Sequence, residues 1–401
     1  MRPKNWRLTA MVAAVAVAAI AAGGALAHRQ GPRNSPSANA APLSGSRSPT
    51  PTPTPPPTTT PPTQTASVTP PKPPSTKPSR TPTTTGPVKR TVNVAKLRQG
   101  RAPQVTYVSG RTVRGGPGSV VTIPGSADIH QVARLNNAVL AVVGKGTGSE
   151  MLTVDSQNRI VRRTPDVSAI VTTEDGLAAA YVATRRDESG GPLPGATVYA
   201  EQSSVQKLTL PAIGDARLLG YVNGKVYFRG QAEDRASTWT LYEWIPGTSK
   251  ATPVKTVPQA TALSGDGRTA TSLNVLTDFH SCSNVVEVAT GRRLWRSCDY
   301  QLRGFTPSGA TVIGSPYNAE GYAATLASAL DTKTGTLLRE WTGTFLDTVA
   351  EDDQHLLIVA VASGGGGEPG TRSAIIRCSI TTGVCELATP ISTDKLLAFD
   401  G

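Results

Sequence analysis

Short apolar runs separated by polar turns repeat along the chain from Lys96 to the C-terminus. Runs such as AVLAVV at 138–143, KVYF at 225–228 and HLLIVAVA at 355–362 are four to eight residues long and rich in β-branched side chains. Gly, Asp and Asn stand between these runs, and long stretches with the 3.6-residue apolar period of a helix are missing. The pattern therefore predicts an all-β domain over residues 96–401.

The polar turns recur at a nearly constant spacing. One series steps by 44, 44 and 48 residues through Gly247, Gly291, Gly335 and Gly383. A second series lies out of phase with the first, at Asn137, Gly176, Gly224, Gly267, Gly309 and Asp353. A unit of about 44 residues that carries two hairpin turns is a four-stranded sheet, the blade of a β-propeller.

The length of the domain predicts seven four-stranded blades, with six or eight as alternatives and a pair of β-sandwiches as the competing fold. The last run, LLAFD at 396–400, can pair with the first runs, VTYV at 105–108 and RTV at 111–113. Such pairing would close the ring with one strand from one end of the domain and three from the other. It would also remove the exposed strand edges that invite aggregation.

The N-terminal segment has the pattern of an export signal. Residues 1–7 are basic, Leu8–Ala27 is an apolar run, and Ala25-Leu26-Ala27 provides the small residues that signal peptidase requires. Residues 1–27 are therefore predicted to be a signal peptide or, if cleavage fails, a signal anchor. Both alternatives predict export, either as a secreted protein or as one held on the outer side of the cell membrane by this segment.

Residues 28–95 are predicted to form a disordered Pro/Thr/Ser-rich linker. Residues 31–90 hold 18 of the 33 prolines, and such a composition cannot bury enough apolar surface to offset the entropy of ordering. Residues 1–95 also hold eleven of the 40 basic residues and no acidic residue, so most of the formal charge of +12 belongs to them. The balanced charge of the β domain disfavours nucleic acid as a partner.

Several turns of the β domain resemble those of a known family. LSGDGRTA (263–270), VATGRRLW (288–295), FTPSGATVIG (305–314) and DTKTGTLLREW (331–341) are similar to turns of TolB-like and WD-repeat-like propellers exported by high-GC bacteria. The resemblance covers roughly residues 96–401 and rests mostly on turn residues. It implies a β-propeller that is a ligand- or protein-binding scaffold more often than an enzyme.

The four cysteines flank two of the predicted hairpin turns. Four cysteines allow three pairings, and the local pairing, Cys282 with Cys298 and Cys378 with Cys385, fits the hairpins best. Disulfides are the expected state after export to an oxidising compartment. A metal site is the competing interpretation, but no CxxC pair is present and the four histidines are scattered, so no metal is expected.

No motif of a hydrolase, zinc protease or phosphate-binding loop is present in the sequence. Ala329, Asp331, Gly335 and Trp341 partly match the turns of quinone-dependent propellers, in which the Trp docks neighbouring blades, but Trp341 is displaced by two positions. We therefore predict neither enzymatic activity nor a cofactor. The alternative is a propeller enzyme that acts on an extracellular polymer or uses a quinone cofactor.

Ligand-binding residues are predicted on the connections between the second and third strands of the blades. In a four-stranded blade the two tight turns lie on one face and these longer connections on the other, where function is often placed. The predicted connections are residues 145–150, 184–195, 230–238, 276–282, 315–322 and 363–372. The candidate binding residues on them are Arg185, Arg186, Asp187, Asp234, Arg235, Asp278, His280, Tyr317 and Asn318. Ordinary surface charge on solvated loops is the alternative interpretation of these residues.

Together these patterns predict an exported, monomeric, non-enzymatic binding scaffold. Its predicted partner is a protein, a peptide or a cell-wall glycan, and only the N-terminal segment would contact a membrane. A purely structural role, as a cap on the spacer in a surface assembly, is a third interpretation.

Overall fold

A computed structural model describes residues 84–232, 238–277, 280–317, 323–365, 369–393 and 397–399. The predicted signal segment and most of the predicted linker lie outside these residues. Within the described ranges the regular elements are β-strands and one 3-10 helix, η1 (Val94–Lys96). None of the helical structure there is long and apolar enough to cross a membrane.

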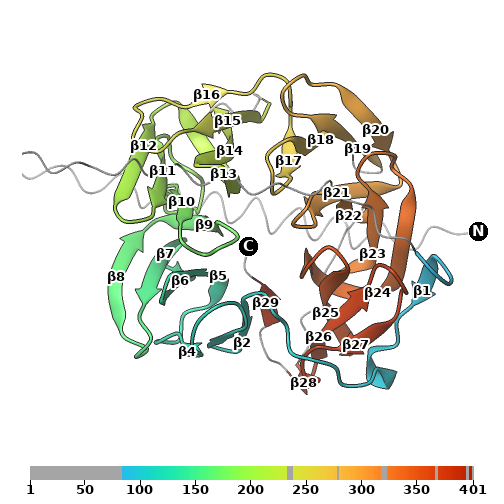
Figure 1. Ribbon diagram of the computed structural model, residues 1–401. Coiled ribbons are helices and arrows are strands. Elements are labelled where there is room, and N and C mark those ends of the chain that lie inside the picture. The colour runs from blue at the N-terminus through green and yellow to red at the C-terminus, as the bar shows by residue number, and fades with distance from the viewer. Residues whose placement is uncertain are drawn as a thin grey trace, which may run out of the picture. The chain divides into compact units, whose positions relative to one another are not determined.

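The strands form seven four-stranded antiparallel blades arranged in a ring (Figure 1). We number the blades in chain order and name the strands of each blade a to d from the centre outward. Blades 1 and 2 consist of β29 (Leu397–Phe399), β2 (Tyr107–Ser109), β3 (Thr112–Arg114) and β4 (Val121–Thr122), and of β5 (Ile129–Leu135), β6 (Ala138–Lys145), β7 (Gly148–Val154) and β8 (Ile160–Pro165). Blades 3 and 4 consist of β9 (Val167–Thr172), β10 (Ala179–Ala183), β11 (Ala196–Glu201) and β12 (Val205–Leu210), and of β13 (Ile213–Val222), β14 (Lys225–Ala232), β15 (Thr240–Trp244) and β16 (Thr252–Pro253).

Blade 5 and the joined blades 6 and 7 complete the ring. Blade 5 consists of β17 (Ala260–Leu263), β18 (Thr269–Thr277), β19 (His280–Glu287) and β20 (Arg293–Ser297). Blades 6 and 7 consist of β21 (Tyr300–Phe305), β22 (Thr311–Pro316), β23 (Ala324–Asp331), β24 (Leu337–Ala350), β25 (His355–Ser363), β26 (Arg372–Ser379) and β27 (Cys385–Leu387). The long strand β24 belongs to both blades, since Trp341 pairs with Ala327 of β23 while Val349 pairs with Leu357 of β25. Two short strands, β1 (Lys89–Thr91) and β28 (Ser392–Thr393), add to β24 and β26.

The C-terminal strand closes the ring as the sequence predicts. β29 pairs with β2 through Tyr107 opposite Phe399 and Ser109 opposite Leu397. Blade 1 therefore takes its inner strand from the C-terminus and its other three strands from the N-terminal part of the domain.

The hydrophobic core is divided into seven clusters, one at each junction between neighbouring blades. The cluster between blades 1 and 2 contains Val108 and Val139, and the cluster between blades 7 and 1 contains Leu357 and Phe399. Because the last junction is filled like the other six, the ring is complete with seven blades. The predicted architecture is thus confirmed, and the alternatives of six or eight blades and of two sandwiches are excluded.

The folded unit begins before residue 96, where the composition placed its boundary. β1 runs parallel to β24 along the edge of blade 6, and Val94 is buried in the cluster between blades 6 and 7. The fully buried Arg339 donates hydrogen bonds only to backbone carbonyls, those of Thr85, Gly86, Pro87, Ile380 and Thr381. The predicted boundary is too late because the valines after Pro87 form a strand and a core contact that the proline-rich composition conceals.

Both predicted disulfides are present. Cys282 is bonded to Cys298 and Cys378 to Cys385, and each pair has its Cα atoms 4.1 Å apart. Cys378 and Cys385 lie directly opposite each other on β26 and β27, and the pairing of Ser283 with Ser297 brings Cys282 beside Cys298. The Cys378–Cys385 disulfide therefore links strands c and d of blade 7, and the Cys282–Cys298 disulfide links strand c of blade 5 to the residue that follows strand d.

Candidate functional site

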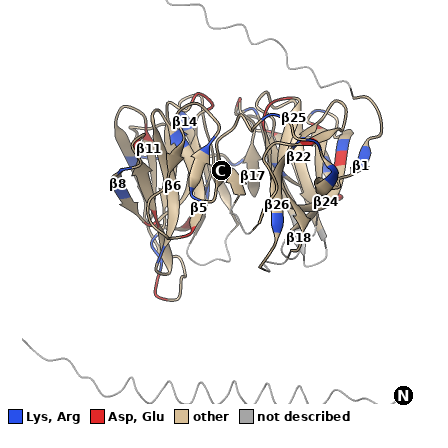
Figure 2. Ribbon diagram, turned by 90° about the horizontal axis from the view of Figure 1, so that it is seen from below, with Lys and Arg blue, Asp and Glu red and all other residues tan. Residues whose placement is uncertain are grey.

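The two faces of the ring differ in their connections. The a–b and c–d turns lie on one face, which we call the turn face, and the b–c connections lie on the other, which we call the connection face, because the strands of each blade are antiparallel. Seen edge-on, the ring carries interspersed basic and acidic residues (Figure 2). This mixture agrees with the balanced charge of the domain.

The predicted residues of blade 3 hold their own loop together. Asp187 accepts hydrogen bonds from the Ser189 and Gly191 backbone N–H groups, at 2.9 and 2.7 Å. Arg186 donates to the Gly190 carbonyl at 2.7 Å, and Arg185 donates to the Pro194 carbonyl at 3.3 Å. These hydrogen bonds fix the shape of the loop between β10 and β11. All three side chains are also exposed on the connection face, so a ligand can reach them.

The other predicted residues are dispersed. Tyr317 follows β22, is 37% exposed, and accepts a hydrogen bond from the Ser281 hydroxyl at its carbonyl. His280 is the first residue of β19. The predictions for Asp234, Arg235, Asp278 and Asn318 fall outside the described residues. The structure thus brings Arg185, Arg186 and Asp187 together but does not assemble the whole predicted set.

Two of the six predicted long connections are in fact tight. Only Gly146 and Thr147 separate β6 from β7, and only residues 278–279 separate β18 from β19. The predicted loop at 276–282 was wrong for most of its length because Ser281 and Ser283 are buried polar residues of a strand, on either side of the disulfide-bonded Cys282. Polar side chains alone do not distinguish such a strand from a loop.

Trp341 of the quinone-like pattern and Trp295 of the preceding blade both dock neighbouring blades. Trp341 of blade 6 donates to the Gly383 carbonyl of blade 7 at 3.0 Å, and Trp295 of blade 5 donates to the Thr332 carbonyl of blade 6 at 2.8 Å. Gly335 has a φ of 74°, and a Cβ there would lie 2.8 Å from the Trp295 ring. This part of the pattern is therefore a packing device between blades.

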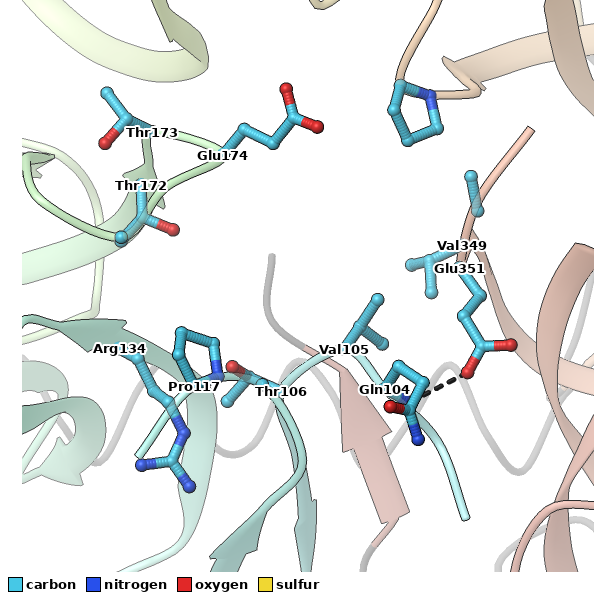
Figure 3. A pocket seen from close by; sticks show the side chains of 14 residues that line it. Gln104, Val105, Thr106, Pro117, Arg134, Thr172, Thr173, Glu174, Val349 and Glu351 are labelled. Atoms are coloured by element: carbon cyan, nitrogen blue, oxygen red, sulfur yellow. Dashed lines mark hydrogen bonds between the residues drawn. The ribbon is translucent and has the colours of Figure 1, made fainter. Parts of the chain in front are cut away.

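A cavity of about 340 Å³ opens at the centre of the turn face (Figure 3). Blades 1, 2, 3, 6 and 7 all contribute to its wall, through Gln104, Val105, Thr106, Gly116, Pro117, Arg134, Thr172, Thr173, Glu174, Gly176, Pro307, Val349, Ala350 and Glu351. Glu174 extends from the a–b turn of blade 3 across the opening and is exposed. Arg134 is 5% exposed and donates its Nε hydrogen to the Gly115 carbonyl at 2.9 Å. The described wall thus combines backbone groups and apolar side chains with one exposed carboxylate, that of Glu174.

Glu351, on the opposite wall, belongs to a buried ion pair. Its carboxylate accepts hydrogen bonds from Arg377 Nη2 and from the Gln104 backbone N–H, both at 2.7 Å. Burial alone would raise the pKa of Glu351, but these hydrogen bonds and the charges of Arg377 and Arg101 together hold the pKa below its usual value. Asp352 and His355 lie close enough to form a metal-ligand group with Glu351, yet its carboxylate is already engaged by arginine.

Exposed aliphatic side chains are concentrated on the turn face. Among the described residues, six of the nine large hydrophobic residues that are exposed flank its turns, namely Val120, Val161, Leu177, Val205, Ile245 and Val384. Tyr317 is the one member of the nine on a b–c connection. Single exposed apolar residues are ordinary, but their uneven distribution between the two faces makes the turn face a candidate interaction surface. The sequence pattern does not predict this surface, because the spacing of the turns indicates the number of blades but not which flanking side chains are exposed.

Comparisons with known proteins return solved structures of low sequence identity. They include TolB from Acinetobacter baumannii, at 16% identity and a TM-score of 0.39, matching 60% of this chain and 66% of that chain. An uncharacterised protein from Listeria monocytogenes matches at 11% identity and a TM-score of 0.45, over 68% of this chain and 84% of that chain. A structure from a study of two prolyl endopeptidases matches at 12% identity and a TM-score of 0.40, over 73% of this chain and 50% of that chain.

This chain spans about two thirds of the TolB chain and half of the prolyl endopeptidase chain. No family model and no curated protein matches the sequence. The propeller fold rests on the seven blades of this chain. Because both binding proteins and enzymes share this fold, function has to be argued from the sites.

Proposed function

We propose that the protein is an exported, monomeric, non-enzymatic binding scaffold whose turn face receives a protein partner. The observation that carries this proposal is the concentration of exposed aliphatic side chains on one face around a central cavity. Interfaces combine an apolar core with a polar rim, and the cavity offers Glu174 as a charged anchor for a cationic group of the partner. The proposed binding surface is therefore the turn face, whereas the sequence predicted the connection face.

Export is supported by the cysteines and by the N-terminal sequence. All four cysteines are paired in disulfides, which persist in oxidising compartments and are rare in the cytosol. The basic start and apolar run of residues 1–27 have the pattern of an export signal. We therefore place the propeller outside the cell, either secreted or anchored by its N-terminal segment.

A catalytic role has less support. Of the three charged residues that line the central cavity, Arg134 and Glu351 are engaged by the hydrogen bonds described above. A reaction that uses both a general acid and a general base would need a second group beside Glu174 within hydrogen-bond reach of the reacting atoms. The enzyme alternative would gain support from a cofactor absorbance band in the purified protein or from turnover of cell-wall material.

The proposal is tested by chemical cross-linking of the tagged full-length protein in its own cell, followed by mass spectrometry. Leu177, Ile245 and Val384 are 52%, 52% and 57% exposed, so replacing all three with Asp should leave the fold intact. We expect a reproducible partner that this triple variant loses and that the Tyr317→Asp control on the connection face retains. A partner retained by the triple variant and lost by the control would refute the turn face as the binding surface.

A further inference from the structure

A second cavity, of about 360 Å³, lies on the connection face between the blade 3 loop and the inner strands of blade 4. Its wall is formed by Arg186, Pro192, Gly214, Asp215, Arg217, Gln231, Ala232 and Trp239. It lies on the face opposite to the central cavity of the turn face, and it contains one of the arginines that the sequence singled out. Its size is within the range of sites for small ligands.

Two arginines share one indole ring at this cavity. Arg217 on β13 and Arg229 on β14 lie directly opposite each other in the sheet. Their guanidinium carbons stand 5.3 and 4.7 Å from the centre of the Trp239 ring. Cation–π contacts hold each guanidinium, but they also place two like charges side by side.

Among the described residues, the positive charge at this position is only partly compensated. Burial, followed by the charge of Arg217, lowers the pKa of Arg229, and Asp215 opposes this effect. Asp215 lies 3.8 Å from Arg217, beyond hydrogen-bond distance. Arg229 donates one hydrogen bond to the Ala260 carbonyl, while its buried Nε finds no hydrogen-bond partner in the described part of the chain. An anion is the group that would balance this cluster.

From this arrangement we infer that the connection face carries a binding site for an anionic sugar unit, charged through a carboxylate or a phosphate. The guanidinium of Arg217, whose side chain is 59% exposed, is the principal anion partner, because arginine forms paired hydrogen bonds with either group. The Asp215 carboxylate lines the same cavity and matches a hydroxyl group of a sugar. The half-buried Trp239 offers an apolar ring surface against which a sugar ring packs.

The site is independent of the proposed partner surface. It uses residues of blades 3 and 4 on the connection face, whereas the partner surface uses the turn face. A ligand could therefore occupy it while a partner is bound, and either proposal can fail without the other.

Isothermal titration of the folded propeller tests the inference with three probes of one size: D-glucuronate, D-glucose 6-phosphate and neutral D-glucose. Arg217→Gln removes the exposed charge, and Arg293→Gln is the matched control, since it removes another exposed charge, from β20. Trp239→Phe keeps a ring in the cavity and tests the stacking surface. Melting temperatures of all variants verify that the fold is intact.

We expect one or both anionic sugars to bind and glucose to bind far more weakly. Arg217→Gln should weaken binding roughly tenfold, as expected for loss of a charge-assisted hydrogen bond, and Arg293→Gln should leave it unchanged. Which anionic sugar binds more tightly distinguishes a carboxylate from a phosphate. Failure of both anionic sugars to bind the folded wild-type protein, or equal affinity for glucose, would overturn the inference, as would affinity that Arg217→Gln does not alter.

Discussion

At the scale of single residues, buried charges join parts of the chain that are far apart in sequence. Arg377 is 3% exposed and Glu351 1% exposed in their side chains, and Arg377 also donates to the carbonyls of Arg101 and Ala102. The pair therefore fastens the segment before β2 to blade 7, beside the closure of the ring. Glu351 lies 247 residues from Gln104 and Arg377 lies 276 residues from Arg101, so no local pattern in the sequence could have predicted these contacts.

Removing the charge of Glu351 should destabilise the fold. Glu351→Gln removes the buried carboxylate partner of Arg377 and leaves it only the more exposed Glu386, and loss of a buried ion-pair partner costs about 3–5 kcal/mol in comparable pairs. Because the pKa of Glu351 is lowered in the folded state, its stabilising contribution is present at neutral pH and is lost as the pH falls through that lowered pKa. Urea unfolding at neutral and acidic pH measures both effects. The control is Glu386→Gln, at the 40% exposed partner of Arg377, whose effect should be smaller.

At the scale of the elements, the regular spacing of the turns made the blades predictable. The connections could not be predicted from polarity, because polar side chains such as Ser281 and Ser283 also occur in buried strands. Gly291 and Gly335 mark c–d turns at which only a positive φ fits, so their spacing follows the blade repeat. Arg186 was found because it lies in a true loop. Arg217 was missed because it belongs to an ordinary strand pattern, and Trp239 because it directly precedes a strand, β15. Only the pairing of β14 with both β13 and β15 brings the two side chains together.

The closing strand should dominate the stability of the ring. Phe399 is 3% exposed and fills the cluster between blades 7 and 1. Phe399→Ala should therefore lower the free energy of unfolding by about 3–5 kcal/mol, the usual cost of deleting a buried aromatic side chain. Val384→Ala, at a 57% exposed position on the turn face, is the control and should change stability little. Comparable small effects for both variants in denaturant unfolding would argue against closure through β29.

At the scale of the whole propeller, two faces of different chemistry are combined in one rigid ring. The turn face carries the exposed aliphatic side chains and the central cavity with Glu174, while the connection face carries the arginine–tryptophan cavity. The folded segment before β1 reaches the ring on the turn-face side, where the Thr85 N–H donates to the Thr381 carbonyl in the c–d turn of blade 7. The fold and its seven blades were predictable from the repeat, whereas the choice of face depended on exposure, which only the folded chain defines.

Site-specific photo-cross-linking tests the central claim, that the turn face receives a protein partner, most directly. A photoreactive amino acid at Leu177 or Val384 samples the turn face of the full-length protein in its own cell, and the same group at Tyr317 samples the connection face. The account predicts discrete adducts with one partner from Leu177 and Val384, and none with that partner from Tyr317. Adducts formed from Tyr317 alone, with Leu177 and Val384 silent, would contradict it.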